Sequence, residues 1–248
     1  MNPKAWEASG HVSGFSDPLV ECANCKGRYR ADHVPVGADG SQKCPNCGHT
    51  LGGARQFNMM FKTYIGATED ESSISYLRPE TAGGIFVNFK NIIDSFHPKL
   101  PFGVGQIGKA FRNEIAPRDF VFRSREFEQM EIEYFVKPSE WEGAFEMWQK
   151  NIHEVNEAIG ISKDAVHELD VADGDRAHYS KRTIDFEFDF PFGRKELYGL
   201  AYRTDFDLQS HEKFSGENLK YKDPETDEEY WPHVIEPTWG VDRSVLAV

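Results

Sequence analysis

The sequence lacks a long apolar run and is poor in basic residues. No stretch approaches the ~20 apolar residues that a membrane-spanning helix needs, and residues 1–7 contain no apolar signal core. We therefore expect a cytoplasmic protein with no membrane partner. The 28 Lys and Arg residues are outnumbered by 41 Asp and Glu, which gives a formal net charge of −13. Because phosphates are neutralised by clustered positive charge, this balance argues against non-specific nucleic-acid binding and leaves only a local basic patch.

Cysteine is also scarce, and its placement indicates a metal site. All four cysteines fall in two C-x-x-C pairs, Cys22/Cys25 and Cys44/Cys47, with 18 residues between the pairs. This spacing predicts a four-thiolate zinc ribbon over about residues 22–50. Four protein ligands leave no open position, so we expect a structural metal. Two disulfides are the alternative, which a reducing cytosol disfavours, and an iron site with the same ligands is a second one. His33 and His49 are spare ligands or, more simply, solvated side chains.

The remaining pattern predicts an α+β protein. With 248 residues, 39% hydrophobic and 28% charged, the chain can bury one substantial core, so we expect one domain over residues 1–248 with the zinc ribbon inserted in it. Helical spacing of apolar residues indicates a helix that opens at 77–82, with Ile85, Phe86, Phe89, Ile92, Ile93 and Phe96 in the core, and a second helix over 141–159. Strands are expected at 57–66, 184–190 and 196–203, with a hairpin at 221–230 whose acidic run is expected to be solvated. Alternation puts Asp185, Glu187 and Asp189 on the face opposite Ile184, Phe186, Phe188 and Phe190, and it puts Glu196, Tyr198, Leu200 and Tyr202 on one face. Runs of strands with few crossover helices favour an antiparallel sheet flanked by helices.

The most informative segment lies between Gly105 and Glu131. Arg112 and Glu114 are two residues apart near the end of an apolar run, so in a strand they share one face. After a proline-containing turn at 116–118, an alternating return strand is expected over 122–131, which presents Arg123, Phe127 and Glu131 together. Two facing strands with these charges and an aromatic ring indicate a nucleotide-binding floor.

This pattern of Phe-Arg-x-Glu, a loop and then Arg-x-x-x-Phe resembles motif 2 of the class II aminoacyl-tRNA synthetases. The segments 76–82, 127–131, 203–208 and 236–243 resemble bacterial glycyl-tRNA synthetases of the α2 type in particular. The resemblance implies the class II antiparallel sheet, ATP-dependent activation of glycine to glycyl-adenylate and, in full-length members, transfer to tRNA(Gly). It also implies a homodimer. Motif 1, which builds the dimer interface in the family, and the anticodon-binding domain have no counterpart in the sequence, so we expect a catalytic core without the family's usual dimer contacts.

The resemblance also assigns roles at an ATP site. Arg112 contacts the α-phosphate and the glycine carboxylate, Glu114 accepts from the adenine amino group, and Phe127 stacks on the base. Arg123 or Arg125 holds the outer phosphates, Arg243 of motif 3 lies across the γ-phosphate, and Glu196 is the best candidate Mg²⁺ ligand, with a solvent-facing carboxylate as the alternative. Arg112, Glu114 and Arg243 are the expected catalytic residues. The complete ATP-binding set is Arg112, Asn113, Glu114, Phe122, Arg123, Ser124, Arg125, Glu126, Phe127, Glu196, Leu197, Gly240, Val241, Asp242 and Arg243.

The glycine site is expected to be tight and polar, because glycine offers no side chain to grip. By resemblance, Glu80, Glu131 and Glu236 face the α-ammonium group. The complete set is Arg30, Glu80, Phe127, Glu128, Gln129, Met130, Glu131, Glu236, Pro237, Thr238, Trp239 and Gly240. Arg30 has a surface arginine as its alternative interpretation. The sequence departs from the family at three positions. The family usually has glutamine at the position of Gly83, asparagine or histidine at that of Tyr202, and a smaller residue at that of Trp239.

Two other functions compete with a glycine-activating enzyme. A non-catalytic synthetase-like module could bind a small ligand or RNA, but it need not retain Arg112, Arg123 and Arg243 together. A zinc-ribbon nucleic-acid adaptor is disfavoured by the net charge of −13.

Overall fold

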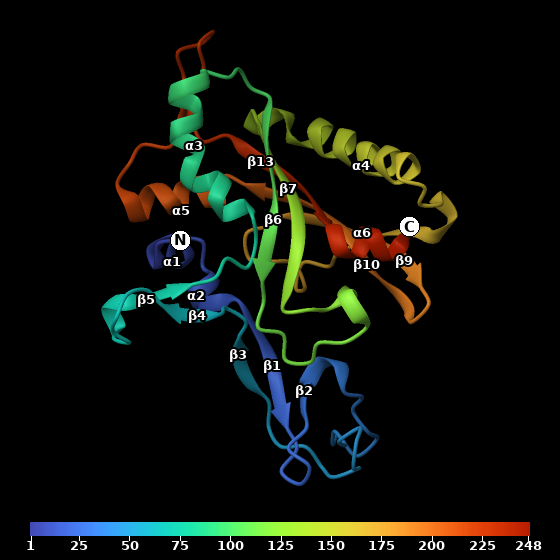
Figure 1. Cartoon of the computed structure of the whole chain (residues 1–248). Coiled ribbons are helices and arrows are strands. Elements are labelled where there is room, and N and C mark those ends of the chain that lie inside the picture. The colour runs from blue at the N-terminus through green and yellow to red at the C-terminus, as the bar shows by residue number, and fades with distance from the viewer.

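The computed structural model describes residues 1–248, and its centre is a six-stranded antiparallel sheet (Figure 1). Every neighbouring pair runs antiparallel. The predicted antiparallel sheet is therefore present. In spatial order its strands are β6 (Phe102–Phe111), β7 (Glu126–Val136), β13 (His233–Gly240), β10 (Gly193–Thr204), β9 (Arg182–Phe190) and β8 (Val166–Asp170).

Helix α4 (Trp141–Ala158) covers one face of this sheet. Phe145 and Ile152 are fully buried against Phe186, Leu200 and Trp239 of the strands. The predicted apolar stripe holds only over its first three turns. Val155 and Ile159 are 36% and 39% exposed, and the buried side chain at that end is Asn156.

The opposite face is shared between two helices and a cavity. Helices α3 (Ala82–Phe96) and α5 (Phe206–Ser215) cover one end of it, where Phe86, Phe89 and Leu208 pack against Phe135 and Val234. The apolar spacing of α3 correctly predicted Ile85, Phe86 and Phe89 as buried, but Phe96 is 79% exposed because α3 extends past the sheet. The uncovered end of this face is the floor of the cavity described below.

Of the two short N-terminal helices, α1 (Pro3–Ala8) packs against α3 and α5, and α2 (His11–Gly14) packs against α1 (Figure 1). Trp6 is fully buried. A Cβ atom added at Gly83 would lie 2.7 Å from the Trp6 ring, so the indole occupies the space that a side chain at position 83 would need. A larger residue at position 83 would therefore require Trp6 to move.

The lower lobe in Figure 1 is a smaller three-stranded sheet next to the cysteines. It comprises β1 (Ser16–Glu21), β2 (Arg28–Arg30) and β3 (Arg55–Asn58), while β4 (Lys62–Tyr64) pairs with β5 (Ile74–Tyr76) in a separate ribbon. The prediction of one strand over 57–66 is therefore wrong. Strand pairing is interrupted at residues 59–61, where the Met59 carbonyl instead accepts a hydrogen bond from the Asn113 N–H at 2.7 Å.

The remaining elements are short. The expected hairpin at 221–230 forms from β11 (Tyr221–Lys222) and β12 (Glu229–Tyr230). Asp223 in this hairpin is buried and pairs with Lys137 at 2.8 Å, so its acidic run is not wholly solvated. Helix α6 (Val241–Ala247) ends the fold, and no helix in the chain is both long and apolar enough to cross a bilayer. Single 3-10 turns are η1 (Ala31–His33), η2 (Glu71–Ser73), η3 (Phe120–Phe122), η4 (Pro138–Glu140) and η5 (Lys163–Ala165).

Candidate active site

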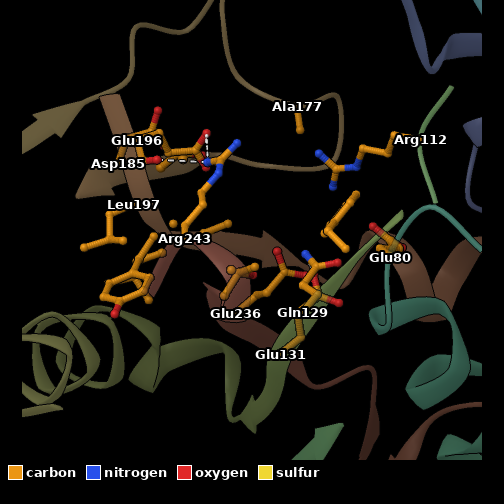
Figure 2. A pocket seen from close by; sticks show the side chains of 18 of the residues that line it. Glu80, Arg112, Gln129, Glu131, Ala177, Asp185, Glu196, Leu197, Glu236 and Arg243 are labelled. Carbon is orange, nitrogen blue, oxygen red and sulfur yellow. Dashed lines mark hydrogen bonds and ion pairs between the residues drawn. The ribbon is translucent and has the colours of Figure 1, made fainter. Parts of the chain in front are cut away.

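A cavity of about 460 Å³ opens on the sheet face that α3 and α5 leave uncovered. Strands β7, β13 and β10 form its floor, the segment 112–124 and the loop 171–179 form its walls, and the start of α6 closes one end. Figure 2 shows Arg112 and Arg243 on opposite sides of this cavity, with Gln129, Glu131 and Glu236 between them. The cavity therefore has a cation on each side and a carboxylate-rich floor.

The Arg112 side chain is held by the backbone carbonyl of Pro79 and by two aromatic rings. Its Nε donates to the Pro79 carbonyl at 3.1 Å, and its guanidinium lies 5.4 Å and 5.3 Å from the ring centroids of Phe15 and Phe127. These cation–π contacts and the hydrogen bond leave the terminal nitrogens free for a ligand.

Arg112 and Glu114 line the cavity, but they do not share a strand face. Strand β6 ends at Phe111, and the Glu114 N–H donates to the Arg112 carbonyl at 2.7 Å in a tight turn. The return strand likewise begins at Glu126 rather than at residue 122, because residues 120–122 form the turn η3. As a result Arg123 lines the cavity and pairs with Glu114 at 3.2 Å, whereas Arg125 donates to the Glu114 carbonyl from outside.

The other end of the cavity holds Arg243 beside two acidic residues (Figure 2). Arg243 Nη1 lies 3.1 Å from Glu196 Oε2, and the guanidinium is 4.4 Å from the Phe122 ring centroid. Burial, followed by the charges of Glu196 and Glu187, raises the pKa of Asp185 to about 7. A carboxyl group with a raised pKa beside an ionised one favours a divalent cation at this end.

A β-bulge places Glu196 in this group. In the pairing of β10 with β9, Glu196 faces Glu187 and Tyr198 faces Phe186, so one extra residue lies between the two pairs. The prediction that Glu196, Tyr198, Leu200 and Tyr202 share one face is therefore wrong for Glu196. It lies on the cavity side with Asp185, and the other three pack in the core beneath α4.

Buried carboxylates gather around Arg203 under the cavity floor. Arg203 has no exposed surface; it donates to both carboxylate oxygens of Asp207 at 2.8 Å and to Glu236. Glu80 lies 3.3 Å from His11 Nε2 and 4.0 Å from Arg203. Although burial opposes ionisation, the charges of His11 and Arg203 hold the pKa of Glu80 at about 2. Glu80 is therefore ionised at neutral pH.

Glu131 joins the floor to helix α3. Its Oε2 accepts from the backbone N–H groups of Thr81 at 2.7 Å and Ala82 at 2.8 Å and from the Thr81 hydroxyl, and its Oε1 accepts from Gln129 at 2.6 Å. Burial and the charges of Glu236 and Glu80 nevertheless raise the pKa of Glu131 to about 8. The four donors favour the ionised form, and the charge of a cation bound in the cavity would lower this pKa further.

The four cysteine sulfurs gather in the lower lobe, with all ligand atoms within 4.8 Å of one another. Cys22 Sγ lies 3.6 Å from Cys47 Sγ, and Cys25 Sγ lies 3.5 Å from Cys44 Sγ. A tetrahedral zinc with Zn–S bonds of ~2.3 Å needs sulfurs about 3.8 Å apart, so the cluster fits that ion. The pairing runs between the two C-x-x-C turns, as a shared metal requires.

The comparison with known families matches most of the chain. The model of the tRNA synthetase class II core domain (G, H, P, S and T) matches residues 61–248. The chain belongs to this family.

Curated relatives extend the match over the N-terminal residues. The chain is 49% identical to a glycine–tRNA ligase of Alkaliphilus oremlandii over 100% of its length, 49% to one of Treponema denticola over 99%, and 47% to one of Geobacillus kaustophilus over 100%. It spans 59%, 55% and 59% of those proteins, respectively. The synthetase core thus resembles a little over half of each relative.

A solved structure supports the fold. The prolyl-tRNA synthetase of Giardia lamblia, solved in complex with prolyl-adenylate, superposes with a TM-score of 0.62 at 16% identity and covers 76% of this chain and 36% of that one. At this identity the likeness concerns the class II fold alone.

Most of the predicted site residues line the cavity of this class II core. Phe122, Ser124, Glu128, Leu197, Thr238, Gly240 and Asp242 do so together with the residues described above. Arg30 does not, because its guanidinium pairs with Asp17 at 2.8 Å and Asp32 at 2.6 Å. The others outside the lining are Asn113, Arg125, Glu126, Met130, Pro237, Trp239 and Val241.

Strand alternation explains several of these exclusions. Met130 and Trp239 point to the α4 side of the sheet, opposite Gln129, Glu131 and Thr238. Glu126 pairs at the surface with Lys109. The sequence set therefore combined residues from both faces of β7 and β13.

Other residues at the site were not predicted. Phe15, Tyr179 and Asp185 line the cavity, and His11 and Arg203 lie beneath it. The alternation of 184–190 predicted that Asp185 faces away from the apolar side, which is the one signal that could have placed it here. No local pattern distinguishes His11 from an ordinary charged residue, and Arg203 was marked only as the first residue of the segment 203–208.

Proposed function

We propose that this chain is the catalytic core of a glycine–tRNA ligase that activates glycine with ATP to give glycyl-adenylate. In the whole protein the glycyl group then passes to tRNA(Gly). The observation that carries the proposal is the floor of the cavity, where Glu80, Glu131 and Glu236 gather around one buried cation, Arg203. The names of the relatives support the same assignment.

An excess of buried carboxylates is a binding site for an ammonium group. Burying unpaired charge is costly, so a floor of this kind favours a ligand cation. Glycine supplies an α-ammonium group, and we expect the three carboxylates to leave no room for the Cβ atom of a larger amino acid. Arg112, on the wall of the same cavity, binds the carboxylate end (Figure 2). The site therefore binds both charged groups of the glycine zwitterion.

The ATP end uses the aromatic and cationic residues. Phe127 stacks on adenine, Glu114 accepts from its amino group, and Arg123 and Arg243 hold the outer phosphates; all four line the cavity. Glu196, with Asp185 beside it, holds Mg²⁺, which supplies charge neutralisation for the phosphates. Arg243 now pairs with Glu196, and bound triphosphate would compete for that guanidinium.

The reaction is a displacement at the α-phosphorus. A glycine carboxylate oxygen attacks, the new O–P bond forms, and the bond to pyrophosphate breaks, so no protein nucleophile is needed. Arg112 bridges the attacking carboxylate and the α-phosphate in the bidentate manner of guanidinium groups and stabilises the charge that develops between them. This role requires the free terminal nitrogens described above.

The cysteine module of residues 22–50 binds structural zinc in this proposal. All four thiolates would be occupied by the metal, which leaves no site for chemistry. Thiolates of this kind stay reduced in the cytoplasm, the compartment of translation. A homodimer, as expected for the family, belongs to the whole protein.

The decisive test is glycine-dependent exchange of pyrophosphate into ATP by the purified chain. Glycine should support exchange, and alanine and serine should not. Binding of a glycyl-adenylate analogue without exchange would instead favour a non-catalytic ligand-binding module. A folded chain that neither exchanges pyrophosphate nor binds the analogue would refute the proposal for this chain.

A further inference from the structure

Glu133 is a buried acid that none of the roles above uses. It has no exposed surface, and neither carboxylate oxygen has a hydrogen-bond donor. Its neighbours Glu131 and Glu236 both have donors. An ionised carboxylate without any partner is among the most costly groups to bury. The side chain therefore needs a proton or a function that offsets this cost.

The sheet register places Glu133 next to the proposed ammonium site. In the pairing of β7 with β13, Ile235 faces Tyr134 and Thr238 faces Glu131, so Glu236 lies directly opposite Glu133. Cross-strand partners on one face have Cβ atoms ~5 Å apart, which brings the two carboxyl groups into hydrogen-bonding reach. Glu236 lines the cavity, whereas Glu133 lies beneath it.

The charges around this pair leave Glu133 without a cation. The groups that act on it are Glu236 from β13, Arg203 from β10 and Glu131 from β7 itself. Arg203 is already engaged by Asp207, Glu236, Glu80 and the ring of Tyr179. Even with His11 protonated, the carboxylates outnumber the cations in the cluster of Glu80, Glu131, Glu133, Asp207, Glu236, His11 and Arg203. From α5, His211 adds no charge, because burial lowers its pKa.

We propose that Glu133 is a positioning residue that stays protonated and donates a hydrogen bond to Glu236, which fixes the orientation of Glu236 toward the ammonium group of the substrate. One oxygen of Glu236 then accepts from Arg203 and from Glu133, and the ionised charge stays directed at the cavity. Burial and the adjacent Glu236 also raise the pKa of Glu133 well above its ordinary value, which agrees with this geometry. The identity of the ammonium ligand rests on the proposed function. The protonation of Glu133 does not.

Two substitutions separate a proton donor from a space-filling group. Glu133→Gln retains a donor of the same shape and should keep the KM for glycine within about twofold of the wild-type value. Glu133→Leu has no donor, and it should raise the KM for glycine about tenfold or more while the KM for ATP stays unchanged, as expected when a hydrogen bond to a charged group is lost. Because apolar residues replace buried polar groups without loss of stability, the leucine variant should remain folded.

The protonation of Glu133 can be tested without an activity assay. The unfolding midpoint in urea is measured from pH 6 to pH 9 for the wild-type protein and for Glu133→Gln. A carboxyl group whose folded pKa is raised contributes stability that is lost as pH rises toward that pKa, so the wild-type curve should fall more steeply than that of the glutamine variant.

Each outcome bears on a different statement. If the wild-type protein and Glu133→Gln lose stability equally with rising pH, Glu133 is not protonated in the folded state. An unchanged glycine KM in Glu133→Leu, or a raised one in Glu133→Gln, would overturn the positioning role. If the wild-type chain shows no glycine-dependent exchange, the proposed function fails, and the urea comparison still decides whether Glu133 is protonated.

Discussion

The carboxylate of Glu131 caps helix α3 by accepting the backbone N–H of Thr81 at 2.7 Å. Thr81 is the N-cap residue, but its own side chain caps nothing and instead donates to the same carboxylate. A residue from the sheet thus replaces the usual local cap, and the anion lies at the positive end of the helix dipole. The same side chain is a proposed ligand of the substrate ammonium, so fold and binding depend on one carboxylate.

Substitution of Glu131 should separate these two functions. Glu131→Met leaves the N–H groups of Thr81 and Ala82 and the amide of Gln129 without acceptors, and it should cost about 2–4 kcal/mol in the free energy of unfolding. In Glu131→Gln one amide oxygen can still accept at α3, and Gln129, whose Oε1 lacks a partner, can turn to accept from the new NH₂ group. Urea unfolding should therefore find the glutamine variant within about 1 kcal/mol of the wild type.

The glutamine variant should nevertheless bind glycine poorly, because a bound ammonium group favours the ionised form of Glu131 and glutamine cannot carry that charge. We expect a raised KM for glycine in the exchange assay at unchanged stability. Equal stability of the methionine and glutamine variants would contradict the capping role, and an unchanged glycine KM in Glu131→Gln would contradict the binding role.

Glu80 should make the protein sensitive to acid. Its pKa is held at about 2 in the folded state, compared with an ordinary value of 4.5. A lowered carboxyl pKa contributes stability that is complete above pH 4.5 and is lost as pH falls toward 2. From the size of the shift, Glu80→Gln should lose about 3 kcal/mol at pH 7, and this difference from the wild type should shrink as pH falls below 4.5.

Unfolding in urea at pH 7, 5, 4 and 3 tests this expectation. Glu217→Gln is the control, because Glu217 is exposed and its carboxylate has no partner. A difference between wild type and Glu80→Gln that stays constant with pH would show that the loss is one of packing and not of charge. Glu131 acts in the opposite direction, since its raised pKa favours the folded state at lower pH.

Strand alternation predicted much of the site, because a period of two is a property of the chain itself. It placed Asp185 opposite Phe186, and it grouped Phe127 with Glu131, as the structure has them. It failed at Glu196, because the bulge in β10 exists only in register with β9 and leaves no mark in the sequence. The class II motifs supplied the chain order of the site. The turn at 112–114 could not be predicted, because the Asn113 N–H donates to the Met59 carbonyl, which is distant in the sequence.

Long-range packing explains what no local pattern could. Arg203 is bound by Asp207, four residues away, and by Glu236, 33 residues away on another strand. Tyr202 stacks on Trp141 with ring centroids 4.1 Å apart, and Trp239 packs against Trp148 at 6.4 Å. Both departures from the family pattern therefore lie against α4, on the far side of the sheet from the cavity. Only the folded chain shows that neither side chain lines the cavity.

Removal of the metal should loosen the lower lobe and leave the large sheet intact. The core of this lobe contains only five buried residues, Val20, Cys22, Val34, Cys44 and Leu51, which is too small to fold without a metal. Cys44→Ser should therefore reduce the zinc content well below one ion per chain, and hydrogen exchange should rise over residues 16–58 but not in β7 or β13. His49→Ala is the control, because His49 Nδ1 and Nε2 are outside the sulfur cluster. Full zinc content in Cys44→Ser would contradict the four-thiolate site.

Loss of Arg112 should stop adenylate formation without unfolding the protein. The side chain is half-buried, its one protein hydrogen bond goes to the Pro79 carbonyl, and its rings Phe15 and Phe127 stay in place without it. Because Arg112 is proposed to bridge two anionic groups in the transition state, Arg112→Ala should lower kcat for pyrophosphate exchange by about 10²-fold or more. Arg112→Lys should lose nearly as much, since a single ammonium group cannot bind both anions in the same plane.

Arg118→Ala is the matched control from the same loop. Arg118 is exposed, outside the cavity lining, and paired with Asp119 at 3.5 Å, so its loss should leave exchange unchanged. The assay measures exchange at saturating glycine and ATP, with urea unfolding of each variant alongside. If Arg112→Lys retained full kcat, a point charge would suffice and the bidentate bridge would be wrong. If Arg118→Ala fell as far as Arg112→Ala, the effect would belong to the loop as a whole and not to the guanidinium between Phe15 and Phe127.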